Sequence, residues 1–163
     1  MDVETAYKTY FVLIREKCRR MLRDYAQADD VAQETFVRFW KTGLAGKDPK
    51  QVTAWLYRTS TRIGIDQLRA QRGREKPAEA SDDQTAEDLA SLDAPTDDVL
   101  SARQRLLRLA GSLPADELEL VLLWRIDGLS QKEIAEVAQV SDRTVRRSLQ
   151  RFEDRVSRLR RDR

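Results

Sequence analysis

The first part of the chain carries apolar residues at three- and four-residue steps, which is the spacing of one face of an α-helix. This pattern predicts a first helix over residues 7–25, a second over residues 29–41 and a third from Pro49 through residue 72. The stretch GLAGKDPKQ between the second and third helices is polar, and we expect a loop there that begins at Gly43.

One apolar stripe defines the inner face of the second predicted helix. Ala32, Phe36, Phe39 and Trp40 recur at helical spacing. We expect Phe36 and at least one of Phe39 and Trp40 to lie in the core. The core candidates of the first and third helices are Phe11, Ile14, Cys18, Leu22, Val52, Trp55, Leu56, Ile63, Ile65 and Leu68.

The composition of the chain changes after residue 73. Residues 74–98 have few large apolar side chains and many acids, Ala and Ser, which is typical of a linker. Helical spacing resumes in VLSARQRLLRLAGSL and PADELELVLLWRIDG, and no convincing run alternates apolar and polar residues as a strand would. The predicted fold class is all-α, with two small helical domains at residues 1–73 and 99–163 joined by a flexible acidic linker at residues 74–98.

Charge is segregated along the chain, although the net charge of the 163 residues is only +2. Residues 1–74 hold 15 Lys/Arg and 9 Asp/Glu, a net charge of +6. Residues 75–98 hold 9 acids and one base, a net charge of −8, and residues 99–163 hold 14 bases and 10 acids, a net charge of +4. Two basic blocks around an acidic segment are typical of a protein that binds a polyanion.

The residue inventory argues against an enzyme and against a metal site. There is no histidine, which removes the commonest general base and metal ligand, and the single cysteine, Cys18, can form neither an internal disulfide nor a zinc site. No apolar run approaches the roughly 20 residues that a membrane span needs. We therefore expect a soluble cytoplasmic protein without cofactors or membrane association.

The segment LSQKEIAEVAQVSDRTVRRSLQRF has the layout of a helix-turn-helix. Ser130 and Glu133 have the S-x-x-E spacing of a capping box that opens a short helix. Gln139 and Val140 form the predicted turn, and Ser141 is a candidate N-cap for a second helix. On that helix Val145, Leu149, Phe152, Val156 and Leu159 share one side.

The opposite side of the second helix is cationic. A helix that presents Arg and Gln outward fits the major groove of DNA, where Arg pairs with guanine and Gln with adenine. The alternative is a solvated charged face. Asp154 lies on the same side, so base reading is expected to stop near Arg151. The candidate reading residues are Arg143, Thr144, Arg146, Arg147, Gln150 and Arg151, and Arg155, Arg158, Arg160, Arg161 and Arg163 are expected to touch phosphates or solvent.

Two parts of the chain resemble bacterial extracytoplasmic-function (ECF) sigma factors of the sigma-70 family. DYAQADDVAQETFVRFWK followed by AWLYRTSTRIGIDQLRAQRGR resembles their region 2. LPADELELVLLWRIDGLSQKEIAEVAQVSDRTVRRSLQRFEDRVSRLR resembles their region 4. The resemblance implies a region 2-like three-helix bundle, a region 4-like helix-turn-helix domain, and a factor that binds core RNA polymerase and directs promoter-specific initiation.

The resemblance also implies roles for particular residues. The second helix would contact the β′ clamp helices of RNA polymerase through Asp29, Asp30, Gln33, Glu34 and Arg38, although a face that only serves solubility is the alternative. The second domain would read the −35 element and contact the β flap. Recognition and melting of the −10 element would use aromatic stacking and cations along the strand, from Lys47, Lys50, Trp55, Tyr57, Arg58, Arg62 and Arg69.

Four positions depart from the family pattern. Thr61 and Arg62 stand where an Asn-containing stretch is common, and Arg62 does not reproduce the paired donor and acceptor of Asn. Gln139 stands where the turn usually has Gly, and Arg143 replaces the Gly that commonly opens the reading helix. A positive φ at Gln139 would cost about 1 kcal/mol.

Other functions remain open at the level of sequence. The acidic linker could mimic RNA, serve as a plain spacer, or fold onto a basic block and mask DNA binding. A stand-alone helix-turn-helix regulator is the main alternative function, and an anti-sigma or adaptor protein that never touches DNA is a third. The resemblance further implies three partners: an anti-sigma factor, promoter DNA and core polymerase.

Overall fold

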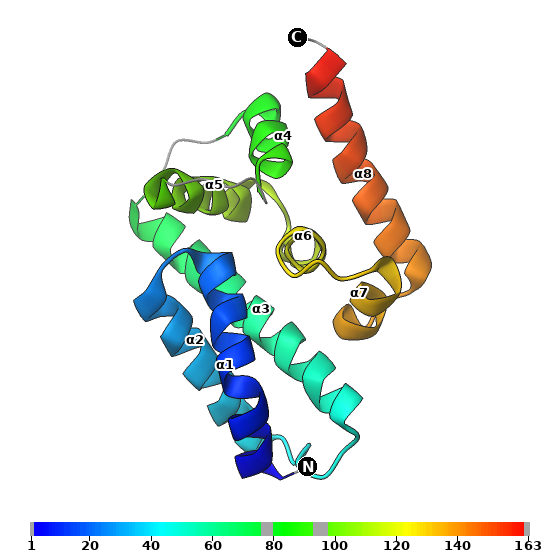
Figure 1. Ribbon diagram of the computed structural model, residues 1–163. Helices are drawn as coiled ribbons and strands as arrows, with labels where there is room; N and C mark the ends of the chain where they lie inside the picture. Colours follow the sequence, from blue (N-terminus) through cyan, green and yellow to red (C-terminus); the bar gives the residue numbers. More distant parts are fainter. Residues whose placement is uncertain (1, 76–79, 93–97, 162–163) are drawn as a thin grey trace. The chain divides into compact units, whose positions relative to one another are not determined.

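The computed structural model describes residues 2–75, 80–92 and 98–161. Those residues form helices only, without a strand, so the predicted all-α class is confirmed (Figure 1). The described residues divide into two compact units at Gly64 and Ile65, a boundary that falls inside the third helix. The predicted domain limits at residues 73 and 99 remain predictions. The helices are α1 (Val3–Leu22), α2 (Tyr25–Lys41), α3 (Pro49–Glu75), α4 (Asp82–Ala90), α5 (Val99–Ser112), α6 (Ala115–Arg125), α7 (Gln131–Ala138) and α8 (Asp142–Arg161).

The helices α1 and α2 form an antiparallel pair in the first unit (Figure 1). Both begin earlier than the apolar pattern predicts, because aspartates cap them: the Asp2 side chain accepts a hydrogen bond from the Thr5 amide, and Asp24 accepts one from Gln27. Arg23 joins the two helices in the left-handed conformation, with φ of 53°. The core lies between this pair and the first half of α3, and its largest fully buried apolar side chains are Ile14, Met21, Leu22, Phe39 and Leu56.

The predicted apolar stripe of α2 is divided between core and surface. Phe36 and Phe39 are buried, whereas the Trp40 side chain is 75% exposed. Consecutive residues point about 100° apart around a helix, so Phe39 and Trp40 do not face the core together. Phe39 takes the inner position, with its ring 5.7 Å from the ring of Trp55, which is half-buried.

A lysine lies inside the first unit. Lys17 of α1 is 0% exposed, and its Nζ donates a 2.7 Å hydrogen bond to Oγ1 of Thr61 on α3. The ammonium also lies 5.5 Å from the centre of the Tyr57 ring. A buried charge is tolerated only when polar groups replace its water. Thr61, one of the departures from the family pattern, is therefore an internal polar contact.

Close packing of α1 on α3 depends on Gly64. A Cβ at this position would collide with Cε of Met21, the flexible end of that side chain. A larger residue at Gly64 would therefore force the end of the Met21 side chain to shift within the core. The opposite side of α3 near Gly64 is not packed in this way, because Arg62 there is exposed.

The second unit contains the predicted helix-turn-helix, formed by α7 and α8. The capping box is confirmed: Oγ of Ser130 accepts from the Glu133 amide at 3.2 Å, and the Glu133 carboxylate accepts from the Ser130 amide at 2.8 Å. These hydrogen bonds lower the pKa of Glu133, with the bond from the Ser130 amide as the main cause. The Ser141 hydroxyl caps α8 by accepting from the Thr144 amide at 3.1 Å.

The acidic stretch expected to be a flexible linker holds a helix, α4. Ser81 caps it by accepting from the Gln84 amide, and Ala86, Leu89 and Leu92 are buried. The helix packs on α5 and α8 within the second unit. Three apolar residues at helical spacing are enough to seat one short helix on a neighbouring surface, which a count of acidic residues does not reveal.

Replacing Gln139 with Gly should stabilise the second unit. Gln139 lies in the turn with φ of 56°, a conformation that costs a non-glycine residue about 1 kcal/mol. We expect Gln139→Gly to raise the free energy of unfolding by roughly this amount in urea denaturation. Lys132→Gly, at an exposed position in the first turn of α7, should not raise it, because this residue is already helical. A lower free energy of unfolding in Gln139→Gly would contradict the inferred backbone strain at this position.

Candidate nucleic-acid interface

The helix α8 is held in place by apolar side chains on one face. Val145, Leu149 and Phe152 are buried, and Val156 is half-buried. The helix packs on α6 and α7, whose buried residues include Leu118, Leu122 and Ile134. Because these contacts fix the rotation of α8 about its own axis, they also decide which residues face outward. Leu159, the last residue of the predicted apolar face, lies outside the side chains that the structure describes.

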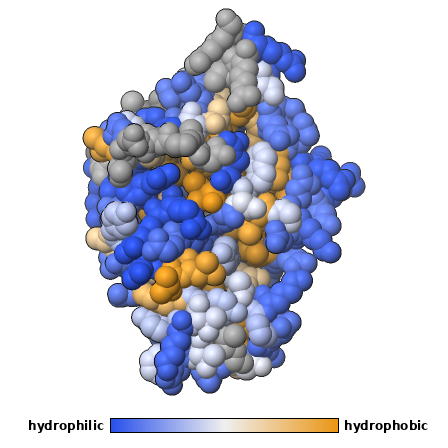
Figure 2. All heavy atoms as spheres, in the orientation of Figure 1, coloured by the Kyte–Doolittle hydropathy of each residue, from blue (hydrophilic) through white to orange (hydrophobic). Residues whose placement is uncertain are grey.

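The outward face of α8 is polar and mostly cationic. The side chains along this helix, at the right in Figure 2, are hydrophilic. A shallow hollow of about 640 Å³ follows this face between Thr144 and Arg151. All six candidate reading residues are exposed, namely Arg143, Thr144, Arg146, Arg147, Gln150 and Arg151.

Two of the six candidates are tied to neighbouring acids. An Nη2 atom of Arg151 lies 3.3 Å from the Glu117 carboxylate of α6 and donates to Oγ of Ser148 at 3.2 Å. Gln150 donates to the Asp154 carboxylate at 3.0 Å. Both contacts are at the surface, where ion pairs are worth at most about 1 kcal/mol. They orient the side-chain tips without locking them, and Asp154 marks the end of the uninterrupted cationic face.

The predicted polymerase-contact residues lie along one side of α2. Asp30, Gln33, Glu34 and Arg38 are exposed, and Asp29 is half-buried. Glu34 and Arg38 form an ion pair of 2.8 Å one turn apart. Asp29 lies 3.4 Å from Arg19 of α1, whose guanidinium is 4.8 Å from the centre of the exposed Tyr25 ring. The structure thus brings these five residues together on one helix face, with Asp29 engaged in packing α1 against α2.

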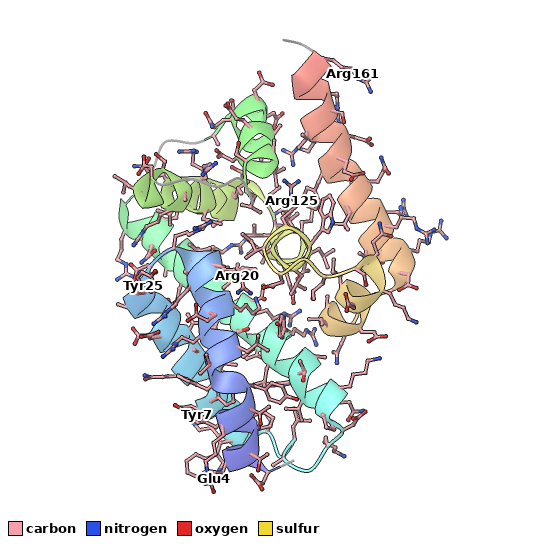
Figure 3. All side chains as sticks on the ribbon, in the orientation of Figure 1. Glu4, Tyr7, Arg20, Tyr25, Arg125 and Arg161 are labelled. Atoms are coloured by element: carbon pink, nitrogen blue, oxygen red, sulfur yellow. The ribbon has the colours of Figure 1, made fainter. Side chains whose placement is uncertain are left out.

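An apolar groove that the sequence did not predict adjoins this face. It encloses about 640 Å³ between the first turns of α1 and the last turns of α2. Tyr7 and Glu4, labelled in Figure 3, mark its α1 side. The sequence signal was misleading because Trp40 belongs to a helical apolar stripe and was counted as a core candidate. The groove is lined by Val3, Glu4, Tyr7, Lys8, Gln33, Phe36, Val37 and Trp40.

The predicted single-strand contacts fall into two groups. Lys47, Lys50 and Arg62 are exposed, on the loop before α3 and on α3 itself, whereas Trp55, Tyr57 and Arg58 are half-buried. The ring contacts of Trp55 with Phe39 and of Tyr57 with Lys17 are internal. Within the second unit, the Arg69 guanidinium donates to the Leu113 carbonyl at 3.2 Å. The structure therefore leaves the lysines and Arg62 more accessible than the two aromatic rings.

No helix in the described ranges has the length and apolar content of a membrane span. The described residues also contain no grouping of three or more acids or cysteines that could hold a metal ion.

Comparison with known families gives two matches in one order. The profile of Sigma-70 region 2 matches residues 6–74, and the profile of Sigma-70, region 4 matches residues 103–152. The first match covers most of α1, all of α2 and nearly all of α3, and the second covers most of α5, all of α6 and α7, and the first half of α8. Together they define a two-region sigma-70 architecture.

Curated relatives agree with these matches. The chain is 28% identical over 176 residues to the ECF RNA polymerase sigma factor SigW of Bacillus subtilis, covering 99% of this chain and 88% of that protein. It is 27% identical over 164 residues to the ECF RNA polymerase sigma-E factor of Escherichia coli K12, covering 94% and 85%. It is 30% identical over 131 residues to the probable RNA polymerase sigma factor RfaY of Xanthomonas campestris, covering 79% of this chain but only 33% of that protein. The chain belongs to the sigma-70 family as a sigma factor of the ECF group.

Proposed function

We propose that this sigma factor engages core RNA polymerase through α2 and reads the −35 element of promoters through α8. Members of its class direct transcription initiation and are not enzymes. The observation that carries the proposal is the division of α8 into a buried apolar face and an exposed cationic face. The exposed face therefore presents a row of arginines on a single α-helix, and the major groove of DNA is wide enough to admit an α-helix.

Within α8 the residues nearest its start are the candidates for base contacts. In a helix-turn-helix the N-terminal part of the second helix enters the major groove. Arg146 and Arg147 are exposed in that part, and the structure gives neither an acidic partner among the described contacts. Arg143 and Thr144 lie one turn earlier, and Gln150 and Arg151 one turn later. Farther along α8, Arg158 is exposed and suited to a phosphate.

For the polymerase contact, the exposed polar face of α2 and the apolar groove beside it are suited to one partner. Interfaces combine a central apolar anchor with a polar rim. Val37 and Trp40 supply exposed apolar area, and Asp30, Gln33, Glu34 and Arg38 surround it with polar groups. The proposed partner is the β′ clamp helices, and the β flap would contact the second unit.

Single-stranded −10 DNA would follow the loop before α3. Lys47 and Lys50 provide exposed cations there, and Arg62 continues the charge along α3. Trp55 and Tyr57 would need to rotate out of their internal ring contacts to stack on a base. We further propose that the protein works in the cytoplasm and is restrained by an anti-sigma factor that covers these surfaces.

Trp40→Ala should weaken binding to core RNA polymerase. A central exposed aromatic that becomes buried in an interface costs about 2 kcal/mol or more when truncated, roughly 30-fold in Kd. The measurement is the Kd of the labelled full chain for core polymerase, together with initiation from a −35/−10 promoter. Val12→Ala is the control, because Val12 is exposed on α1 but does not line the groove. Failure of the unaltered chain to associate with polymerase would overturn the polymerase part of the proposal.

Arg147→Ala and Arg158→Ala should weaken DNA binding in two different ways. Loss of Arg147 should cost roughly 1–3 kcal/mol of DNA affinity and relax the preference at one base pair. Loss of Arg158 should weaken binding to all sequences and reduce the slope of log K against log salt by about one unit. Titration of a randomised duplex library at two salt concentrations, followed by sequencing of the bound fraction, separates the two. If both variants behaved like a phosphate contact, α8 would not be the reading helix.

A further inference from the structure

The helix α4 carries four carboxylates and no basic residue, and it packs on helices of a basic segment, residues 99–163. Asp82, Asp83, Glu87 and Asp88 fall within its nine residues. The residues from 99 to 163 have a net charge of +4. In Figure 1 the helix lies beside α5 and α8, and its packing on both is part of the second unit. The acids of α4 thus equal in number the excess positive charge of the segment that contains the DNA-reading helix.

One buried ion pair fixes α4 to α5. The Asp88 side chain is only 1% exposed, and its two carboxylate oxygens accept hydrogen bonds of 2.8 Å each from Nε and Nη2 of Arg108. This bidentate contact raises the pKa of the Arg108 guanidinium, which remains charged. Loss of the partner of a buried carboxylate strongly destabilises the folded state, because the charge is left uncompensated. Asp88 can therefore remain buried only while α4 is docked on Arg108.

Three more arginines hold the two ends of α4. Arg105 donates to the Ser91 carbonyl at 3.0 Å, and Arg125, labelled in Figure 3, donates to the Ala90 carbonyl at 3.4 Å. These contacts place cations at the negative C-terminal end of the helix. At the other end, Arg155 of α8 lies 3.5 Å from the Asp82 carboxylate. These polar contacts add to the burial of Ala86, Leu89 and Leu92, and the exposed contact of Arg155 with Asp82 should weaken as salt rises.

An open cleft of about 370 Å³ borders α4. Leu89 of α4, which is itself buried, lines this cleft together with Trp124 of α6 and with Phe152 and Val156 of α8. A helix of nine residues is not stable by itself in water, so α4 exists only as long as it stays docked. Because α6, α7 and α8 also pack directly on one another, α4 can separate from them without removing the contacts among these three helices.

The docked helix borders the DNA-reading face. Gln150 lines both the cleft that borders α4 and the hollow along the cationic face of α8. Arg155, one turn beyond Arg151, has its charge paired with Asp82 of α4. Charges within about 8–10 Å of one another interact at physiological salt. The carboxylates of α4 consequently reduce the positive potential that a DNA phosphate meets along this part of α8.

We propose that the surface formed by α5, α6 and α8 around Arg108 is a reversible docking surface for an acidic helix, and that α4 is its occupant in the free protein. Docked α4 lowers the affinity of the second unit for DNA, and release of α4 raises it. The inference rests on the proposed reading of DNA by α8. It gives the acidic segment a specific function: the free factor is kept from binding DNA indiscriminately, and any partner that displaces α4 activates DNA binding.

The test compares two substitutions that remove the same charge from the same helix. Asp88→Asn breaks the buried pair with Arg108, whereas Asp83→Asn removes an exposed carboxylate. Hydrogen exchange of the amides of residues 85–91 in the full chain reports whether α4 stays docked. The Kd for a mixed-sequence 30-base-pair duplex, at low and physiological salt, reports DNA affinity. A third variant, Ala86→Pro, disrupts α4 without leaving an unpaired charge in the interface.

We expect Asp88→Asn and Ala86→Pro to accelerate exchange in residues 85–91 and to tighten DNA binding at least about fivefold, the lower end of typical coupling between sites. Asp83→Asn should change both readouts much less. Rapid exchange of α4 in a variant whose Kd equals that of Asp83→Asn would overturn the inference, as would unprotected α4 amides in the unaltered chain. If neither the variants nor the unaltered chain bound the duplex, the proposed DNA-reading role would fail as well. If the chain bound the duplex tightly and Arg147→Ala weakened this binding, the DNA-reading role would remain intact.

Discussion

The burial of Val145, Leu149 and Phe152 is the contact on which the functional geometry of this sigma factor depends. These three side chains determine which way α8 is turned, and the direction of every arginine on the helix follows from that rotation. The exposed charge contributes little to holding the helix, because exposed ion pairs are weak. Stability and recognition are thus supplied by opposite faces of one helix, and residues of the outer face can change without loss of the fold.

The sequence was sufficient to predict the elements that carry strong local signals. The helix-turn-helix followed from the capping box at Ser130 and Glu133 and from the apolar spacing of α8, and the structure has both. The left-handed turn at Gln139 could be anticipated from the family pattern, and its φ is positive. In these places a short-range rule, such as a cap or a turn, determines the conformation whatever the rest of the chain does.

Other features depend on contacts between distant segments, and sequence patterns did not reveal them. Helical periodicity could not decide between Phe39 and Trp40, because only packing against α3 shows which one is enclosed. The docking of α4 was not predicted, because its acids suggested a solvated linker and its partner Arg108 lies twenty positions away in the chain. The apolar groove beside α2 was hidden for the same reason as Trp40: a surface residue and a core residue of equal hydropathy look alike in a sequence.

The ammonium of Lys17 also has a consequence for how the first unit assembles. Its contacts with Thr61 and the Tyr57 ring are both on α3, on consecutive turns of that helix. A slip of α1 along α3 by a single turn, about 5.4 Å, would break the hydrogen bond to Thr61. Apolar side chains tolerate such sliding, since one methyl group replaces another at small cost. An internal cation does not tolerate such sliding, because it needs its polar partner. It therefore selects one alignment of the two helices, whereas apolar contacts alone would permit several.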